Sequence, residues 1–242
     1  NSLSILPKPG NTILVELPGS NIAAPALTIA STGNALRIGK SGIFINSSGA
    51  SSGNPLVLNG SFSIENAGRY VHRTQRGNAS IVSKLLLEPT TYRGIFEFDV
   101  PGNAGYTLSV SGRQFGSLFL SSATAGKKSY TGNGSSSLRI YGDLEVGDSS
   151  SFTSSLNNNI HIGNNLVVKG RLVLNPSLAD SINRVLEFNG DSSSISITGN
   201  WILGDNFNQV LLSRGCCQLK SNASVNKANA SWKIAASASM ML

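Results

Sequence analysis

Two acidic residues that lie two positions apart are the first candidates for chemistry in this chain. Glu97 and Asp99 belong to the stretch 95–100 (IFEFDV), whose alternation predicts a β-strand. Successive side chains on a strand point to opposite faces, so the two carboxylates share one face and Phe96 and Phe98 share the other. Such a pair could act as general acid and base or ligate calcium. We expect instead the solvated side of a strand whose phenylalanines face the core.

The stretch 68–77 (GRYVHRTQRG) holds the clearest concentration of positive charge. If it forms a strand, arginines occupy one face, and a tyrosine and a histidine occupy the other. Arginine beside tyrosine can hold sulfate, carboxylate or phosphate and stack on sugar rings. The alternative is a solvated loop whose charges cluster by chance. The candidate residues for binding a glycan or another polyanion are Arg69, Tyr70, His72, Arg73 and Arg76.

Other reactive residue types form no constellation. His72 and His161 are far apart in sequence with no cysteine beside either, and a zinc site needs three or four converging ligands, so no metal and no cofactor is expected. Cys216 and Cys217 are adjacent, and a disulfide between neighbours strains the peptide, so no ordinary disulfide framework is expected. Gly134-Ser135 lies in a run of serines without a nucleophile elbow, and neither cysteine has an evident base beside it. We therefore expect a protein that is not an enzyme.

The elements that must position these residues are short apolar runs interrupted by Gly, Asn or Ser. The phrase 142–146 (GDLEV) is echoed about 21 residues later at 163–168 (GNNLVV) and again at 199–203 (GNWIL). Period-2 alternation within each run predicts half-buried strands. Predicted inward positions are Ile140, Leu144, Val146, Ile160, Ile162, Leu166, Val168, Leu172 and Leu174. Predicted outward positions are Tyr141, Asp143, Glu145, His161, Lys169 and Arg171.

Such a series of strands predicts an all-β protein, either a parallel β-solenoid or a β-sandwich or jelly roll. Stacked coils pair every backbone group and build one continuous apolar core. The 21-residue echo and the scarcity of two-residue hairpin signals favour the solenoid. Three segments are predicted: N-terminal β-coils at 1–68, a wider or inserted β segment at 69–136, and C-terminal solenoid coils at 137–242, truncated at the end.

Composition limits the class of protein. Only 13% of the 242 residues are charged, against about 25% in typical globular proteins, and Ser, Asn, Thr and Gly supply the polarity. This composition is typical of extracellular β proteins. The net charge of +7 either maintains solubility or attracts polyanions such as acidic glycans, lipopolysaccharide or nucleic acid. No apolar run reaches 18 residues, so no transmembrane segment is expected.

The phrases LRIYGDLEVGDSSSF, IHIGNNLVVKGRLVL and VLEFNGDSSSISITGNW resemble the repeats of large secreted and surface proteins of Bacteroidetes-type bacteria. In that family, "GNLTVxGTLxL" phrases, here 163–174, alternate with "LxFNGxxxQxIxG" phrases, here 186–199. The resemblance covers roughly residues 137–205. It implies a right-handed parallel β-helix, an extracellular or cell-surface location, and a larger exported parent chain. It also implies a role as adhesin or scaffold.

Together these features predict a non-catalytic structural or adhesive segment. Its expected partners are glycans or other acidic surface polymers, without specific recognition of nucleic acid. One alternative is a polysaccharide lyase or hydrolase on a β-helix, which needs acidic or basic residues converging on one exposed face. The other is a carbohydrate-binding module with a flat strip of exposed aromatic side chains, which is hard to build from Trp201 and Trp232.

Overall fold

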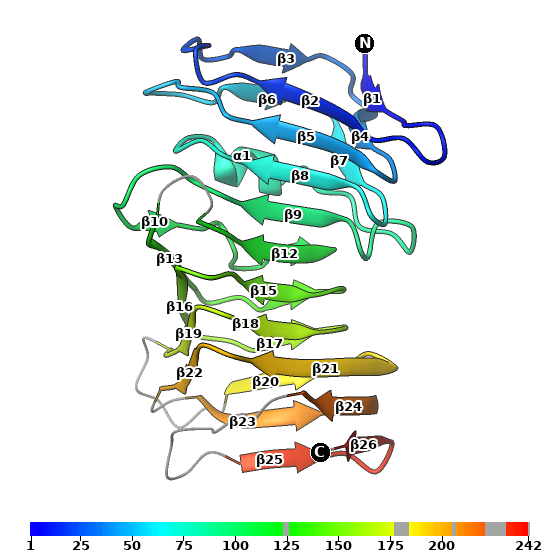
Figure 1. Cartoon of the computed structure of the whole chain (residues 1–242), viewed down its shortest axis with the longest axis vertical. Coiled ribbons are helices and arrows are strands. Elements are labelled where there is room, and N and C mark those ends of the chain that lie inside the picture. The colour runs from blue at the N-terminus through cyan, green and yellow to red at the C-terminus, as the bar shows by residue number, and fades with distance from the viewer. Residues whose placement is uncertain (123–125, 177–183, 205–206, 221–230, 242) are drawn as a thin grey trace.

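The chain winds into a parallel β-solenoid with its two termini at opposite ends of the stack (Figure 1). The computed structural model describes residues 1–122, 126–176, 184–204, 207–220 and 231–241. Every strand pair within these ranges is parallel. A sandwich or jelly roll would pair its strands antiparallel, so the predicted solenoid is confirmed.

One sheet, here called the long sheet, runs the whole length of the molecule and has ten strands. In order they are β2 (Ile13–Leu17), β5 (Gly42–Asn46), β8 (Arg69–His72), β9 (Ile95–Phe98), β12 (Ser117–Leu120), β15 (Leu144–Val146), β18 (Leu166–Val168), β21 (Ser192–Ile197), β24 (Gly215–Leu219) and β26 (Ala238–Met241). The long sheet passes without a break through all three predicted segments, so all three belong to the same solenoid.

Two shorter faces complete each coil. The face that precedes the long sheet consists of β1 (Leu3–Ile5), β4 (Asn34–Ile38) and β7 (Ser61–Ile64), then β11 (Gln114–Phe115), β14 (Leu138–Ile140), β17 (Ile160–Ile162), β20 (Arg184–Phe188), β23 (Phe207–Leu212) and β25 (Ser231–Ile234). The face that follows it begins with β3 (Leu27–Ile29) and β6 (Leu56–Leu58). It continues as a five-stranded side sheet of β10 (Tyr106–Thr107), β13 (Lys128–Gly134), β16 (Ser150–Leu156), β19 (Arg171–Leu174) and β22 (Asn200–Leu203).

Both shorter faces are interrupted within the middle segment 69–136. The helix α1 (Asn78–Val82) takes the place of a strand between β6 and β10. On the opposite shorter face, an isolated bridge from Phe62 to Leu85 continues the stacking where no strand forms. The middle segment therefore differs in its side walls, while the long sheet holds its coils in the common stack.

The inward side chains form one continuous core. All nine predicted inward positions are at most 1% exposed, as the alternation required. In the N-terminal half the core is aromatic: the ring of Phe96 lies 4.9 Å from those of Tyr70 and Phe98 and 5.6 Å from that of Phe115. Further along the long sheet, Leu118, Leu144 and Leu166 continue the row that contains Phe96, whereas aromatic side chains such as Phe152 and Trp201 fill the core behind the side sheet.

Close stacking at the corners explains why glycine recurs in the repeated phrases. A Cβ on Gly163 would lie 2.2 Å from the carbonyl oxygen of Tyr141, and one on Gly190 would lie 1.7 Å from that of Gly163. Real Cβ atoms do not approach that closely, so the adjacent coil leaves no room for a side chain. Glycine therefore recurs in the repeat because successive coils contact each other closely at these positions.

The second echo of the repeat, 199–203, lies on a different face of the coil from the two phrases that it resembles. The strand that stacks on Leu166–Val168 is β21, through Ile195 and Ile197. The phrase 199–203 instead stacks on 170–174, because Trp201 is in register with Leu172 and Leu203 with Leu174. Both faces select a glycine followed by alternating apolar residues, so the phrase alone does not distinguish them.

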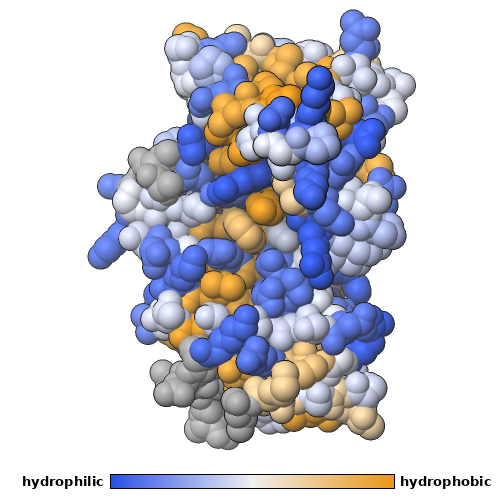
Figure 2. Space-filling view, turned by 45° about the vertical axis from the view of Figure 1, so that its right-hand side comes forward, coloured by the Kyte–Doolittle hydropathy of each residue, from blue (hydrophilic) through white to orange (hydrophobic). Residues whose placement is uncertain are grey.

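Apolar surface gathers at the N-terminal end of the molecule, whereas hydrophilic residues cover much of the rest of the face in Figure 2. The exposed large apolar residues there are Leu6, Ile13, Leu14 and Ile22. The middle of the stack, where the predicted site lies, therefore has a more polar surface than its N-terminal end.

Candidate functional site

The predicted polyanion site lies on β8 and the turn that follows it. As the alternation predicts, Tyr70 and His72 occupy one face of the strand and the arginines occupy the other. That first face is the core face: Tyr70 and His72 are both 0% exposed. A glycan on the surface cannot touch either ring, so the prediction that these two residues bind it is wrong.

Tyr70 and His72 belong to a hydrogen-bonded network inside the solenoid. His72 Nε2 lies 3.2 Å from the hydroxyl of Tyr106, and His72 Nδ1 lies 3.4 Å from that of Tyr70. The side-chain amides of Asn46 and Asn78 donate to the Tyr70 and Tyr106 hydroxyls over 3.4 and 2.9 Å. Burial lowers the pKa of His72 to about 3 and raises the pKa of both tyrosines, so all three side chains are neutral at pH 7.

Two outward arginines, Arg69 on β8 and Arg73 directly after it, form ion pairs with the acidic pair of the next coil. Arg69 forms an ion pair with Glu97, whose other carboxylate oxygen accepts a hydrogen bond from Ser121 over 2.6 Å. Arg73 Nε donates to Asp99 over 3.0 Å. Because the two coils are adjacent, each arginine contacts a carboxylate that is more than 25 residues away along the chain.

The acidic pair is therefore not the solvated strand face that was expected. The side chains of Glu97 and Asp99 are only 4% and 1% exposed, although Phe96 and Phe98 do fill the core as predicted. The outer face of the strand is covered by side chains from neighbouring coils, which lie about 4.8 Å away. Both carboxylates act as ion-pair partners in the outer layer.

The other outward acids are also held by neighbouring coils. Asp143 Oδ1 accepts hydrogen bonds from the Asn164 side chain over 2.6 Å and from the Asn165 backbone and side chain over 3.0 and 2.8 Å. Glu145 pairs with Lys169, and His161 Nδ1 lies 2.8 Å from Glu187. Among the residues that the structure describes, no three His, Cys, Asp or Glu side chains are grouped to hold a metal ion.

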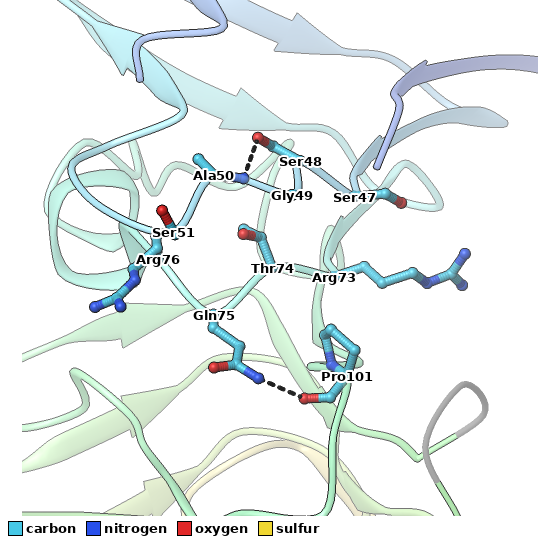
Figure 3. A pocket seen from close by; sticks show the side chains of 10 residues that line it. All are labelled: Ser47, Ser48, Gly49, Ala50, Ser51, Arg73, Thr74, Gln75, Arg76 and Pro101. Atoms are coloured by element: carbon cyan, nitrogen blue, oxygen red, sulfur yellow. Dashed lines mark hydrogen bonds between the residues drawn. The ribbon is translucent and has the colours of Figure 1, made fainter. Parts of the chain in front are cut away.

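A polar hollow of about 330 Å³ lies beside the end of β8 (Figure 3). Residues 47–51, 73–76 and Pro101 line it. In Figure 3 the side chains of Arg73 and Arg76 leave the hollow in different directions, so their guanidinium groups do not converge on one point. The Thr74 hydroxyl, on a residue that is 1% exposed, has no hydrogen-bond partner there.

Of the five predicted residues, Arg76 alone is an exposed cation without an ion pair among the described residues.

Sequence reasoning missed a second group of cations, Lys127, Lys169 and Arg171, which coil stacking brings beside a larger hollow of about 460 Å³. These residues are spread over more than 40 positions, so no local charge cluster marks them. The available signal was the repeat itself, which places Lys169 and Arg171 outward.

Both cysteines, Cys216 and Cys217, are free. The described part of the chain holds no helix with the length and hydropathy to cross a membrane. Comparison of the chain with protein families, curated proteins and solved structures gives no match.

Proposed function

We propose that this chain is a non-catalytic structural and adhesive segment of a secreted or cell-surface bacterial protein, carried within a larger parent chain. The observation that carries the proposal is the unbroken ten-stranded long sheet, which makes the segment a stiff rod. A rod of stacked coils holds its outward side chains at fixed intervals and is suited to extended binding surfaces. The resemblance to repetitive surface proteins supports the same role.

The engagement of the outward acids supports a role in display over a role in catalysis. A polysaccharide lyase or hydrolase on a β-helix needs acids or bases that face the substrate. Glu97 is bound by Arg69 and Ser121, and Asp143 is bound by three donors from the next coil. These carboxylates stabilise contacts between coils.

The tryptophans do not form the flat aromatic strip of a carbohydrate-binding module. Trp201 is 4% exposed and packs edge-on against Trp232, with their ring centroids 6.2 Å apart. The two tryptophans therefore offer a glycan no flat stacking surface.

The test is a screen of the purified chain against an array of neutral and acidic glycans, joined to an assay for cleavage of the same polymers. We expect retention of at least one class of glycan and no new reducing ends or unsaturated products after long incubation. Release of shortened polysaccharide would contradict the non-catalytic role. Failure to retain any glycan would contradict the adhesive role.

A further inference from the structure

The hollow of about 460 Å³ lies at the corner where the long sheet gives way to the side sheet. One row of outward positions on the side sheet lines it: Ser129, Ser151, Arg171 and Asn200 are in register on four successive coils. Strands in a sheet lie about 4.8 Å apart, so three intervals give a row about 14 Å long, parallel to the solenoid axis. The hollow, here called the corner groove, is therefore suited to an extended chain that runs along the axis.

The corner groove is basic. Lys127 and Lys169 line it together with Arg171, and no acidic residue is among the described residues that line it. Lys169 is held by Glu145 over 2.7 Å, whereas Lys127 and Arg171 are exposed and form no ion pair with any acid that the structure describes. Two cations are thus available to a ligand.

Lys128 also lines the corner groove but is committed elsewhere. Its ammonium group donates to the carbonyl oxygens of Gly102 and Ala104 over 2.9 Å and to that of Pro101 over 3.3 Å. The residue is 3% exposed, so it fixes the 101–104 turn and contributes little to the surface. The charge that a ligand meets comes from Lys127 and Arg171.

Neutral hydrogen-bonding groups flank Arg171 in the row. The Ser151 hydroxyl donates to that of Ser129 over 3.1 Å, which leaves further donor and acceptor capacity on both. Asn200 adds an exposed amide at the far end of the row. Hydroxyl and amide groups beside cations match a polymer that carries both hydroxyls and anionic groups.

We propose that the corner groove binds an acidic polysaccharide lying along the solenoid axis. Its carboxylate or sulfate groups contact Lys127 and Arg171, and its hydroxyls bond to Ser151 and Asn200. The inference rests on the proposed adhesive function and names the ligand class and the surface. Single-stranded nucleic acid is the less suitable ligand because its binding depends on aromatic stacking, and no aromatic residue is among the described residues lining the groove.

The test compares two double variants with equal net charge. Lys127→Ala/Arg171→Ala removes the free cations of the corner groove, and Lys8→Ala/Lys40→Ala removes two exposed cations elsewhere; each changes the net charge from +7 to +5. Binding to heparin and to polygalacturonate, one sulfated and one carboxylated, is measured at low and moderate salt. We expect at least a tenfold loss of affinity in the groove variant, and less than a twofold loss in the control. Circular dichroism and the unfolding temperature show whether both variants fold.

Three results would overturn the inference. Equal losses in the two variants would mean that net charge, and not the corner groove, binds the polymer. Equal or tighter binding of a single-stranded DNA oligonucleotide at matched salt would exclude a preference for polysaccharide. If the chain retained neutral glycans only, the proposal of an acidic ligand would be wrong, although the proposed adhesive function would still hold. Arg171→Gln, a single change on the surface, repeats the comparison if the double variant does not fold.

Discussion

Two basic regions of this molecule differ in what the fold does with their charge. Around β8 the arginines are close in sequence, yet Arg69 and Arg73 are paired with carboxylates that are 4% and 1% exposed. In the corner groove the cations are distant in sequence, yet Lys127 and Arg171 remain exposed and unpaired among the described residues. In a solenoid, surface neighbours lie one coil apart, about 20 to 30 residues away in this chain. Charge density along the sequence is therefore a poor guide to charge on the surface.

The inward row of the long sheet also changes along the stack, from aromatic to aliphatic side chains. Phe96 on β9 and Leu144 on β15 occupy the same inward row, linked through Leu118. Phe96 contacts rings of its own coil and of the two neighbouring coils, whereas Leu144 is stacked between Leu118 and Leu166. This row therefore depends on larger side chains around Phe96 than around Leu144.

The largest predicted effect tests that difference. Phe96→Ala should lower the free energy of unfolding by about 4 kcal/mol, and Leu144→Ala by about 3 kcal/mol, because the larger side chain leaves the larger cavity. Chemical denaturation of both variants measures the two losses. A smaller loss at Phe96 than at Leu144 would show that the aromatic part of this row tolerates cavities better than the aliphatic part.

The buried histidine gives the N-terminal half a sensitivity to acid. The pKa of His72 is lowered to about 3 in the folded chain, against about 6.5 when unfolded. Between these values the unfolded state binds a proton that the folded state excludes, so stability is full above pH 6.5 and falls as the pH drops. The expected slope is about 1.4 kcal/mol per pH unit, or about 2 kcal/mol between pH 6.5 and 5.

The matched control for this pH effect is His72→Gln, which keeps a polar side chain but does not titrate. It should be less stable than the parent at pH 7 and lose less stability on acidification. Unfolding free energies at pH 7, 6 and 5 measure the pH dependence of stability for both proteins. The acidic residues contribute equally to the two slopes, so the difference between the slopes reports on His72. Parallel slopes for the two proteins would contradict the lowered pKa of His72.

The paired and unpaired arginines should differ in stability by a smaller amount. Arg69→Ala leaves the Glu97 carboxylate with only the Ser121 hydroxyl among its side-chain partners in the structure, which should cost about 2 kcal/mol. Arg171→Ala removes an exposed side chain without an ion pair and should change stability by less than about 0.5 kcal/mol. Denaturant titration of both variants measures the difference. Equal losses would contradict the distinction between the two regions.

The sequence predicted the parallel solenoid and the inward row of the C-terminal half, because alternation and a recurring glycine carry that information directly. It also predicted that Arg69 and Arg73 would share one strand face, opposite Tyr70 and His72. It did not predict that Glu97 and Asp99 would be covered, because the partner that covers each carboxylate lies on another coil. The distance from β8 to β9 is 26 residues along the chain, and no local pattern encodes such a pairing.

The candidate site was predicted less well than the fold for a related reason. Alternation assigns Tyr70 and His72 to the face opposite the arginines, but it does not say which face is the core. A tyrosine and a histidine are compatible with either side. Inside the core the Tyr70 hydroxyl is satisfied by Asn46 and His72 by Tyr106, which in turn accepts from Asn78 of α1, and these partners lie on other coils or on the helix.

The smallest predicted effect tests whether the outward row next to the corner groove contributes to stability or to binding. Next to its row runs a second outward row, in which Thr107, Thr131 and Thr153 are followed by Val173 and Ile202. The Thr107 and Thr131 hydroxyls are hydrogen-bonded over 3.1 Å, but Val173 and Ile202 occupy the equivalent positions two and three coils beyond Thr131. Thr131→Val should therefore change stability by less than about 0.5 kcal/mol.

The same variant should leave binding to heparin within twofold of the parent, because Thr131 is not among the residues that line the corner groove. Thr131→Val keeps the net charge and nearly the shape of the side chain, so it changes only the hydroxyl. A tenfold loss of affinity would place the threonine row in contact with the polymer, and binding would then extend across the side sheet. An unchanged affinity, beside a loss in Lys127→Ala/Arg171→Ala, would locate the binding energy in the two cations at the corner.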